Sequence, residues 1–279
     1  MTHLMKQCRD ACFRFHSRLA VLILCLGCTT VLTGCGGAGT ADEISDADFR
    51  KAVNELEKLG ARISEENEPL IESSVNMVVL FPEHFDKDGE ILPEVLQPLR
   101  NIRSCLLGLF ESRITDDGLK ALAGYRNVLG LNFHNTMISD EGLVHVSQLR
   151  QLLLLKLSHT RITHDGITRL ANLNKLELIY VAGLEITEET LDHIARMPSL
   201  RGVNLAETTI SNAGIKKLTQ LRKLKYLGLD STNITDDCLE DLMKFPDLQH
   251  LEVTKTDLSD EGIEKLEKFY PDDTVIHDR

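Results

Sequence analysis

The residue best suited to covalent chemistry is Cys35, which ends the stretch Leu32-Thr33-Gly34-Cys35 near the N-terminus. A cysteine thiol in such a place has three possible roles: a structural residue, a catalytic nucleophile, or a site of lipid attachment. The residues around it decide among them. They are basic and then apolar before the cysteine, and glycine-rich after it.

Residues 1–34 have the organisation of a secretory signal peptide. Basic residues stand at positions 6, 9, 14 and 18, and 14 mostly apolar residues follow at positions 19–32. A membrane-spanning helix needs about 20 apolar residues, so export of the chain is the better interpretation. The closing Leu-Thr-Gly-Cys resembles the lipobox of bacterial lipoproteins, which implies that Cys35 is diacylated and becomes the first mature residue. The alternatives are an ordinary secretory signal cut nearby and a lipobox ending at Cys28, which has Cys25 three positions before it.

Evenly spaced carboxylates are the second candidate for chemistry. A column of acidic side chains could hold calcium, but His164 and Asn212 interrupt the column. Each carboxylate also falls in the first turn of an expected helix, where the helix dipole favours negative charge. The histidines at 134, 145, 159 and 164 have no zinc-type spacing. We therefore predict no metal and no cofactor. The carboxylates are Asp116, Asp140, Glu188, Asp236 and Asp260.

Catalytic motifs are absent from the sequence that follows Cys35. It contains no G-x-S-x-G, no H-E-x-x-H and no glycine-rich phosphate loop. Cys105 stands at a position that other repeats fill with charged residues, but no histidine or lysine is placed beside it. Cys238 takes a glycine position and is expected to be packed. We predict that the protein is not an enzyme; an active site within residues 60–100 is the weaker alternative.

The mature chain is acidic. Residues 1–34 hold four of the 31 basic and one of the 43 acidic residues, which leaves 27 − 42, a net charge of −15. Without a basic stripe the chain lacks the electrostatic footprint of a nucleic-acid-binding protein. Only Cys105 and Cys238 remain beside Cys35, too few for a disulfide framework.

The carboxylates, histidines and cysteines discussed above, apart from Cys35 and the cysteines before it, lie within repeats of 24 residues. The repeats begin near residue 102 and run without gaps. The seven units follow the pattern L-x-x-L-x-L-x-x-T-x-I-[ST]-[DE]-x-G-[LI]-x-x-L with some departures, and the unit with Leu184 in place of the hydroxyl and Thr190 in place of the glycine departs most. This pattern resembles the leucine-rich repeat, whose period is about 20 to 29 residues. The resemblance implies a solenoid with a binding surface. The anchor residues are Ile114, Ile138, Ile162, Ile186, Ile210, Ile234 and Leu258.

Each position of the pattern has a physical interpretation. Alternating apolar residues predict short parallel strands near 107–109, 131–133, 155–157, 179–181, 203–205, 227–229 and 251–253. A column of hydroxyl residues can bond loop backbone that would otherwise be unsatisfied. Serine or threonine at 115, 139, 163, 187, 211, 235 and 259 is placed to cap a helix. The hydroxyl column is Ser112, Thr136, Thr160, Thr208, Thr232 and Thr256.

The two ends of the array differ from the repeats. Ser45 and Asp48 resemble a capping box, and apolar spacing predicts an amphipathic helix over residues 45–59 that covers the open end of the array. Residues 75–81 predict a strand, 82–98 an irregular connection with a helical turn, and 274–276 a final strand. We expect five segments: a signal peptide at 1–34, a tether at 35–44, an N-terminal cap at 45–101, seven repeats at 102–270 and a C-terminal cap at 271–279.

The expected fold class is α/β, a right-handed leucine-rich-repeat arc with a parallel sheet on the concave face and short helices on the convex face. Outward strand residues of such an arc form its natural contact surface. We therefore predict a module that is anchored to the outer or cytoplasmic bacterial membrane. We expect it to bind a protein or cell-envelope ligand on its concave face. A structural envelope protein without a specific ligand stays open. The candidate ligand-binding residues are Phe110, Asn132, His134, Lys156, Tyr180, Asn204 and Asp230.

Overall fold

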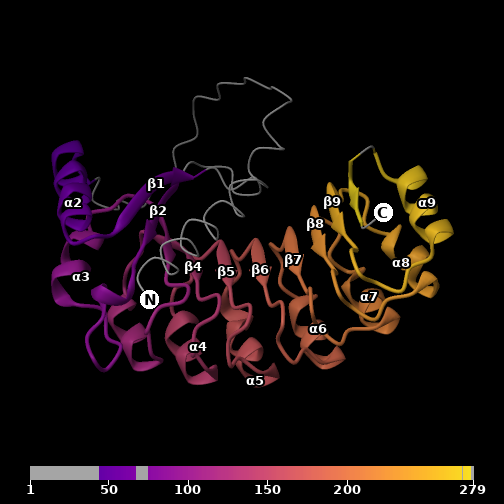
Figure 1. The fold of residues 1–279 in the computed structure, drawn as a ribbon, viewed down its shortest axis with the longest axis horizontal. Helices are drawn as coiled ribbons and strands as arrows, with labels where there is room; N and C mark the ends of the chain where they lie inside the picture. Colours follow the sequence, from indigo (N-terminus) through magenta and orange to yellow (C-terminus); the bar gives the residue numbers. More distant parts are fainter. Residues whose placement is uncertain (1–43, 67–74, 272, 278–279) are drawn as a thin grey trace, which may run out of the picture.

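The protein is described by a computed structural model that covers residues 44–66, 75–271 and 273–277. Its strands form one sheet in sequence order, and every neighbouring pair is parallel except the first. Figure 1 shows an arc with the strands along its inner edge and the helices from α4 (Asp140–Val146) to α7 (Asn212–Leu218) along its outer edge. We call the inner surface, formed by the outward side chains of the sheet, the concave face. The predicted solenoid is therefore present.

The strands are short and stack at the spacing of the repeat. Leu155 pairs with Ile179 in the adjacent strand, as predicted. The predicted boundaries of the seven repeat strands are displaced, because each strand begins one to three residues earlier and ends one residue earlier than predicted. The strands are β1 Arg62–Glu66, β2 Val75–Val79, β3 Cys105–Gly108, β4 Val128–Asn132, β5 Leu154–Lys156, β6 Leu178–Tyr180, β7 Gly202–Asn204, β8 Tyr226–Gly228, β9 His250–Glu252 and β10 Val275–Ile276.

A left-handed residue lies in the turn that follows each repeat strand, three residues after the strand ends. His159 has a φ of 55°, and its N–H donates to the carbonyl of Ala182 in the next unit at 3.0 Å. A non-glycine residue in this conformation costs about 1 kcal/mol or more, which the inter-repeat hydrogen bond offsets. The same conformation recurs at every equivalent position. The column is Glu111, Asn135, His159, Gly183, Glu207, Ser231 and Lys255.

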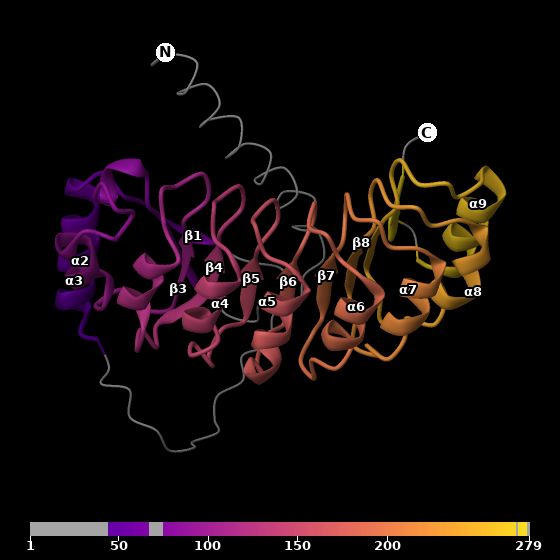
Figure 2. The same cartoon turned by 90° about the horizontal axis from the view of Figure 1, so that it is seen from below.

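Short helices return the chain along the convex side (Figure 2). Most of their buried apolar residues, with the inward residues of the strands, belong to one main core that runs the length of the arc. The helical segments are α2 Asp46–Lys58, η1 Pro82–His84, α3 Pro93–Leu99, η2 Asp117–Leu122, α4 Asp140–Val146, α5 His164–Thr168, η3 Arg169–Asn172, α6 Glu188–Ile194, α7 Asn212–Leu218, η4 Asp236–Cys238, α8 Leu239–Leu242 and α9 Asp260–Phe269.

The hydroxyl column closes the loop after each strand. Thr160 donates to the carbonyl of Leu157 at 2.6 Å, and Thr136, Thr208, Thr232 and Thr256 make the equivalent bond three residues back. Ser112 instead accepts from the N–H of Ile114. Buried backbone carbonyls in the loops are therefore paired, as the sequence predicts.

The aspartates of the helix starts do more than complement the helix dipole. Asp140 accepts from both the N–H and the hydroxyl of Thr163, the cap of the next helix, at 2.8 and 2.6 Å. Asp116 and Asp236 hold Ser139 and Ser259 in the same way. The two hydrogen bonds from Ser259 lower the pKa of Asp236. Each of these carboxylates therefore joins two repeats.

The N-terminal cap contains a strand that the sequence did not predict. The helix expected over 45–59 is present as α2, with Ser45 as its N-cap and Gly60 in a left-handed conformation after it. β1 follows it and pairs antiparallel with β2, which makes β1 the first edge of the sheet. The sequence of β1, Arg62–Glu66, is mostly charged and does not show the apolar alternation that predicts a strand. An edge strand can have such a sequence because it can face water.

At the other end, β10 adds a parallel strand to β9, as expected for residues 274–276. The Tyr270 hydroxyl donates to the carbonyls of Leu242 and Phe245 at 2.5 and 3.2 Å and ties the end of the last repeat to the repeat before it. None of the described helices is both long and apolar enough to cross a membrane. The predicted signal peptide, Cys35 and most of the tether lie outside the described residues.

Candidate functional site

The concave face carries three of the predicted ligand residues at the ends of adjacent strands. Lys156, Tyr180 and Asn204 end β5, β6 and β7, and they lie in register with one another. Side chains alternate along a strand, so these residues point away from the core residues Leu155, Ile179 and Val203. All three are partly exposed.

Aromatic contacts organise this row. The Lys156 ammonium lies 4.6 Å from the centroid of the Tyr180 ring, a cation–π geometry. The Tyr180 ring stacks on that of Tyr226 from β8, with centroids 5.9 Å apart and an interplanar angle of 29°. An amphipathic aromatic pair with a cation on one side is typical of protein contact surfaces.

Tyr226 links the row to β9. Its hydroxyl donates to Glu252 Oε2 at 2.8 Å, while Asn204 Nδ2 donates to the same hydroxyl at 2.5 Å. Burial, followed by the charges of Tyr180 and Glu252, raises the pKa of Tyr226 well above its usual value. The hydroxyl therefore stays protonated and acts as a fixed hydrogen-bond donor.

Asn132 ends β4 and continues this row, in register with Lys156, while Phe110 and His134 lie beyond the strand ends. Asn132 is only 8% exposed, and its Oδ1 accepts from the N–H of His134, so its amide serves the local turn. The His134 ring meets that of His159 edge to face at 5.2 Å. Phe110 lies against Gly108, where an added Cβ would come within 3.1 Å of its ring. Asn132 therefore presents little surface to a ligand.

Asp230 lies beyond the end of β8 and is partly exposed. Its Oδ1 accepts from both the N–H and the hydroxyl of Thr254 at 2.7 Å. These bonds hold the carboxylate at the rim of the concave face, near Glu252.

The sequence reasoning missed a second outward column, made of the residues directly before the core positions. Its leucines form a separate small apolar cluster against which Tyr180 packs. Tyr226 and His250 belong to the same column. Side chains alternate along a strand, so the residues directly before and directly after each core residue both point outward. This rule could have identified the second column. The buried members of the cluster are Val75, Leu106, Leu154 and Leu178.

Both cysteines in the described part of the chain are free and fully buried, although Cys105 was expected at a position that tolerates exposure. Burial raises the pKa of Cys105 to about 12. Burial is also the main reason that the pKa of Cys238 rises to about 12. Neither thiol is suited to act as a nucleophile at neutral pH.

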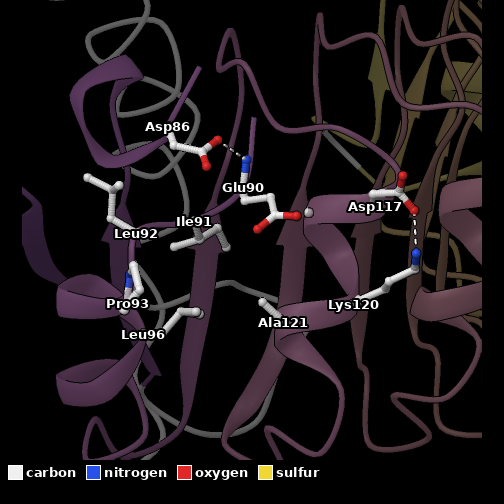
Figure 3. A pocket seen from close by; sticks show the side chains of 10 residues that line it. Asp86, Glu90, Ile91, Leu92, Pro93, Leu96, Asp117, Lys120 and Ala121 are labelled. Carbon is white, nitrogen blue, oxygen red and sulfur yellow. Dashed lines mark hydrogen bonds and ion pairs between the residues drawn. The ribbon is translucent and has the colours of Figure 1, made fainter. Parts of the chain in front are cut away.

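A cavity of about 300 Å³ lies between the N-terminal cap and the first repeat (Figure 3). Asp86 at its rim accepts from the N–H groups of Asp88 and Glu90, and Asp117 forms an ion pair with Lys120. Two of its carboxylates are thus already engaged. Over the described ranges, no three histidine, cysteine or acidic side chains are grouped so as to hold a metal ion.

Comparison with known proteins agrees with this geometry. Residues 246–266 match a family model described as Leucine Rich repeat. The solved structure of internalin C2 from Listeria monocytogenes is similar, with 21% sequence identity and a TM-score of 0.52, over 81% of this chain and 92% of that one. No curated protein matches the sequence. The match at the last repeat and the likeness over the arc show that the chain has the α/β fold of a leucine-rich-repeat solenoid.

Proposed function

We propose that the protein is an exported module that binds another protein or a cell-envelope ligand on its concave face. The observation that carries this is the row of Lys156, Tyr180 and Tyr226, held by a cation–π contact and a ring stack outside the main core. These side chains are not needed to fill the main core. Parallel solenoids use such outward residues for recognition.

We further propose that a lipid on Cys35 anchors the module to a bacterial membrane. The support is the basic lead, the apolar run and the closing Leu32-Thr33-Gly34-Cys35. Two or more acyl chains give stable attachment, whereas one chain is marginal. The glycine-rich residues that follow Cys35 suit a flexible connection to the folded arc.

The test is photocrosslinking from defined positions. A benzophenone amino acid replaces Tyr180 on the concave face, and in a matched control it replaces the exposed Lys216 on α7. On intact membranes we expect a discrete crosslinked product from position 180 alone. The purified partner should then bind the wild type at least about tenfold more tightly than a Tyr180→Ala, Lys156→Ala variant. Equal crosslinking from both positions, or equal affinity for both proteins, would contradict the proposal.

A further inference from the structure

One edge of the arc is basic, although the chain as a whole is acidic. Each helix leads into the next strand through a loop, so these loops lie at the edge where the strands begin, and the acidic helix starts lie at the opposite edge. In the loops before β4 to β8 the one acidic residue is Glu177, which is paired with Arg201. We call the exposed basic residues of these five loops the basic rim: Arg126, Arg150, Lys175, Arg196, Arg222 and Lys223.

Hydrogen bonds between successive loops hold the basic rim in a row. Gln151 Nε2 donates to the carbonyl of Tyr125 in the loop before it at 2.9 Å, and Ser199 Oγ donates to that of Asn174 at 2.7 Å. The linear sequence shows no basic stripe, because the members of the row stand in separate repeats. Stacking of the repeats creates the stripe.

The cations of the basic rim are not neutralised within the described part of the chain. None of the ion pairs there includes a member of the rim. Helix dipoles do not account for these residues, because the effect of a dipole falls off within the last turn. Arg150, for example, lies four residues beyond Val146, where α4 ends. Arg222 donates to the carbonyl of Lys244 at 3.3 Å, which neutralises no charge.

The chain that leads to Cys35 leaves the arc at this same edge. Arg103, in the loop before β3, donates to the carbonyl of Ile44 at 3.2 Å and forms an ion pair with Asp46 at the start of α2. Ile44 is the first described residue, and Cys35 precedes it by nine residues, which span at most about 30 Å. Strands stack about 4.8 Å apart, so the loops before β3 to β8 extend over about 24 Å. A bilayer that holds a lipid on Cys35 is therefore within reach of the basic rim.

We propose that the basic rim binds the anionic lipid headgroups of the membrane that carries the anchor. This rests on the proposed lipid on Cys35, which brings the rim to the bilayer. A row of exposed cations adds to the attachment that acyl chains provide, because anionic headgroups attract each of them. The strands then point away from the membrane, and the concave face stays open to a partner beside it.

The test measures which edge of the anchored protein lies near the headgroups. A fluorophore is attached to the full lipoprotein through Asn174→Cys beside the basic rim, and in the matched control through Glu185→Cys at the opposite edge of the same repeat; both positions are exposed. The vesicles are phosphatidylcholine with nitroxide-labelled headgroups, with or without about one third phosphatidylglycerol. With phosphatidylglycerol we expect quenching at least about threefold stronger at position 174. About 1 M salt should remove the difference, because it screens charges beyond about 3 Å.

Matched charge removal identifies the residues responsible. A rim variant, Arg150→Gln, Lys175→Gln, Lys223→Gln, should show equal quenching at the two positions. A control variant that loses three exposed cations from the opposite edge should keep the difference, and melting temperatures report whether both variants are folded. The control is Arg113→Gln, Arg161→Gln, Lys255→Gln.

Equal quenching at the two positions of the otherwise wild-type protein, or an unchanged difference in the rim variant, would overturn the proposal. Equal quenching together with binding of dextran sulfate that the rim variant loses would assign the rim to an anionic envelope polymer instead. If mass spectrometry finds no lipid on Cys35, the anchor is wrong, and sedimentation of the unlabelled chain with the same vesicles decides the rim. At least about threefold more binding to the phosphatidylglycerol vesicles would support it, and equal binding would overturn it.

Discussion

At the scale of single residues, one contact explains why three of the repeats require glycine. A Cβ on Gly166 would lie 2.1 Å from Asp140 Oδ1, and Gly142 and Gly262 face Asp116 and Asp236 in the same way. Where a residue that is not acidic replaces the aspartate, the glycine 26 residues later is replaced too, whereas Glu188 is followed by Gly214. His164 is followed by Thr190, whose hydroxyl it contacts at 3.1 Å, and Asn212 by Cys238.

This contact predicts non-additive stability. Gly166→Ala should cost about 2 kcal/mol, because the new methyl group displaces the carboxylate that holds Thr163. In an Asp140→Ala background the same change should cost at least about 1 kcal/mol less, since no carboxylate is displaced and alanine favours a helix. Denaturant unfolding of the four proteins measures this, with Asp165→Ala as an exposed control. Strictly additive costs would show that the close approach is not a constraint.

The two buried thiols lead to a prediction on reactivity. With a pKa of about 12, only about one thiol in ten thousand is ionised at pH 8. Iodoacetamide should therefore leave Cys105 and Cys238 unmodified in the folded protein and modify both in denaturant. Peptide mass spectrometry reads each site separately, and an exposed cysteine introduced as Lys216→Cys calibrates the rate. Modification of Cys105 at the rate of this control would place it at the surface.

At the scale of elements, a three-residue strand packs one face into the core and exposes the other on the concave face. In β6, Ile179 is fully buried in the main core, while Tyr180 lies on the concave face. The strand is too short to be stable alone, and its position depends on its neighbours β5 and β7. Core side chains should therefore determine stability, and concave side chains should determine binding.

We expect Ile179→Ala to destabilise the protein by roughly 2–5 kcal/mol, through lost burial and the cavity left behind. Replacing both Phe110 and Tyr180 by alanine should cost far less, about 1 kcal/mol for the lost ring stack with Tyr226. Thermal melting compares the two variants. If the double alanine variant were as unstable as Ile179→Ala, the assignment of core and concave face would be reversed, and the binding surface with it.

At the scale of the whole molecule, the arc is a chain of nearest-neighbour contacts between two different ends. The N-terminal cap is joined to the first repeat by Tyr125, whose hydroxyl donates to the carbonyl of Leu96, and by Asn127, which donates to Leu99 and Ile102. Tyr270 does the equivalent at the other end. Because the core is continuous between the caps and consists of described residues, we expect the arc to fold without a contribution from residue 35.

The anchor can therefore be tested without disturbing the fold. Cys35→Ser should abolish labelling by a fatty-acid analogue and leave the protein unprocessed or soluble, because the hydroxyl cannot replace the thiol in lipid transfer. Membrane fractionation with detergent-phase partition, and the mass of the N-terminal peptide, provide the measurement. The melting temperature of the arc should match that of the wild type. A wild-type N-terminus that is unmodified and differs from Cys35 would identify a freely secreted protein.

The sequence alone determined the parts of the fold that depend on period and side-chain type. Residues 24 apart must stack for Leu155 and Ile179 to share one core, so periodicity is sufficient to predict the sheet and its register. The helix at the N-terminal end and the hydroxyl column followed from local capping and hydrogen-bonding rules. The array as a whole and three adjacent candidate positions on the concave face could be placed this way.

Only the tertiary structure decided which side chains meet. Tyr226 and Glu252 are 26 residues apart, and their contact depends on how two side chains cross between strands. Asn132 turns into its own loop, and β1 joins the sheet despite a charged sequence. The left-handed turn at His159 and its equivalents has no sequence signal, because most of these residues are not glycine. Each depends on distances between backbones of neighbouring repeats, which exist only once the repeats have stacked.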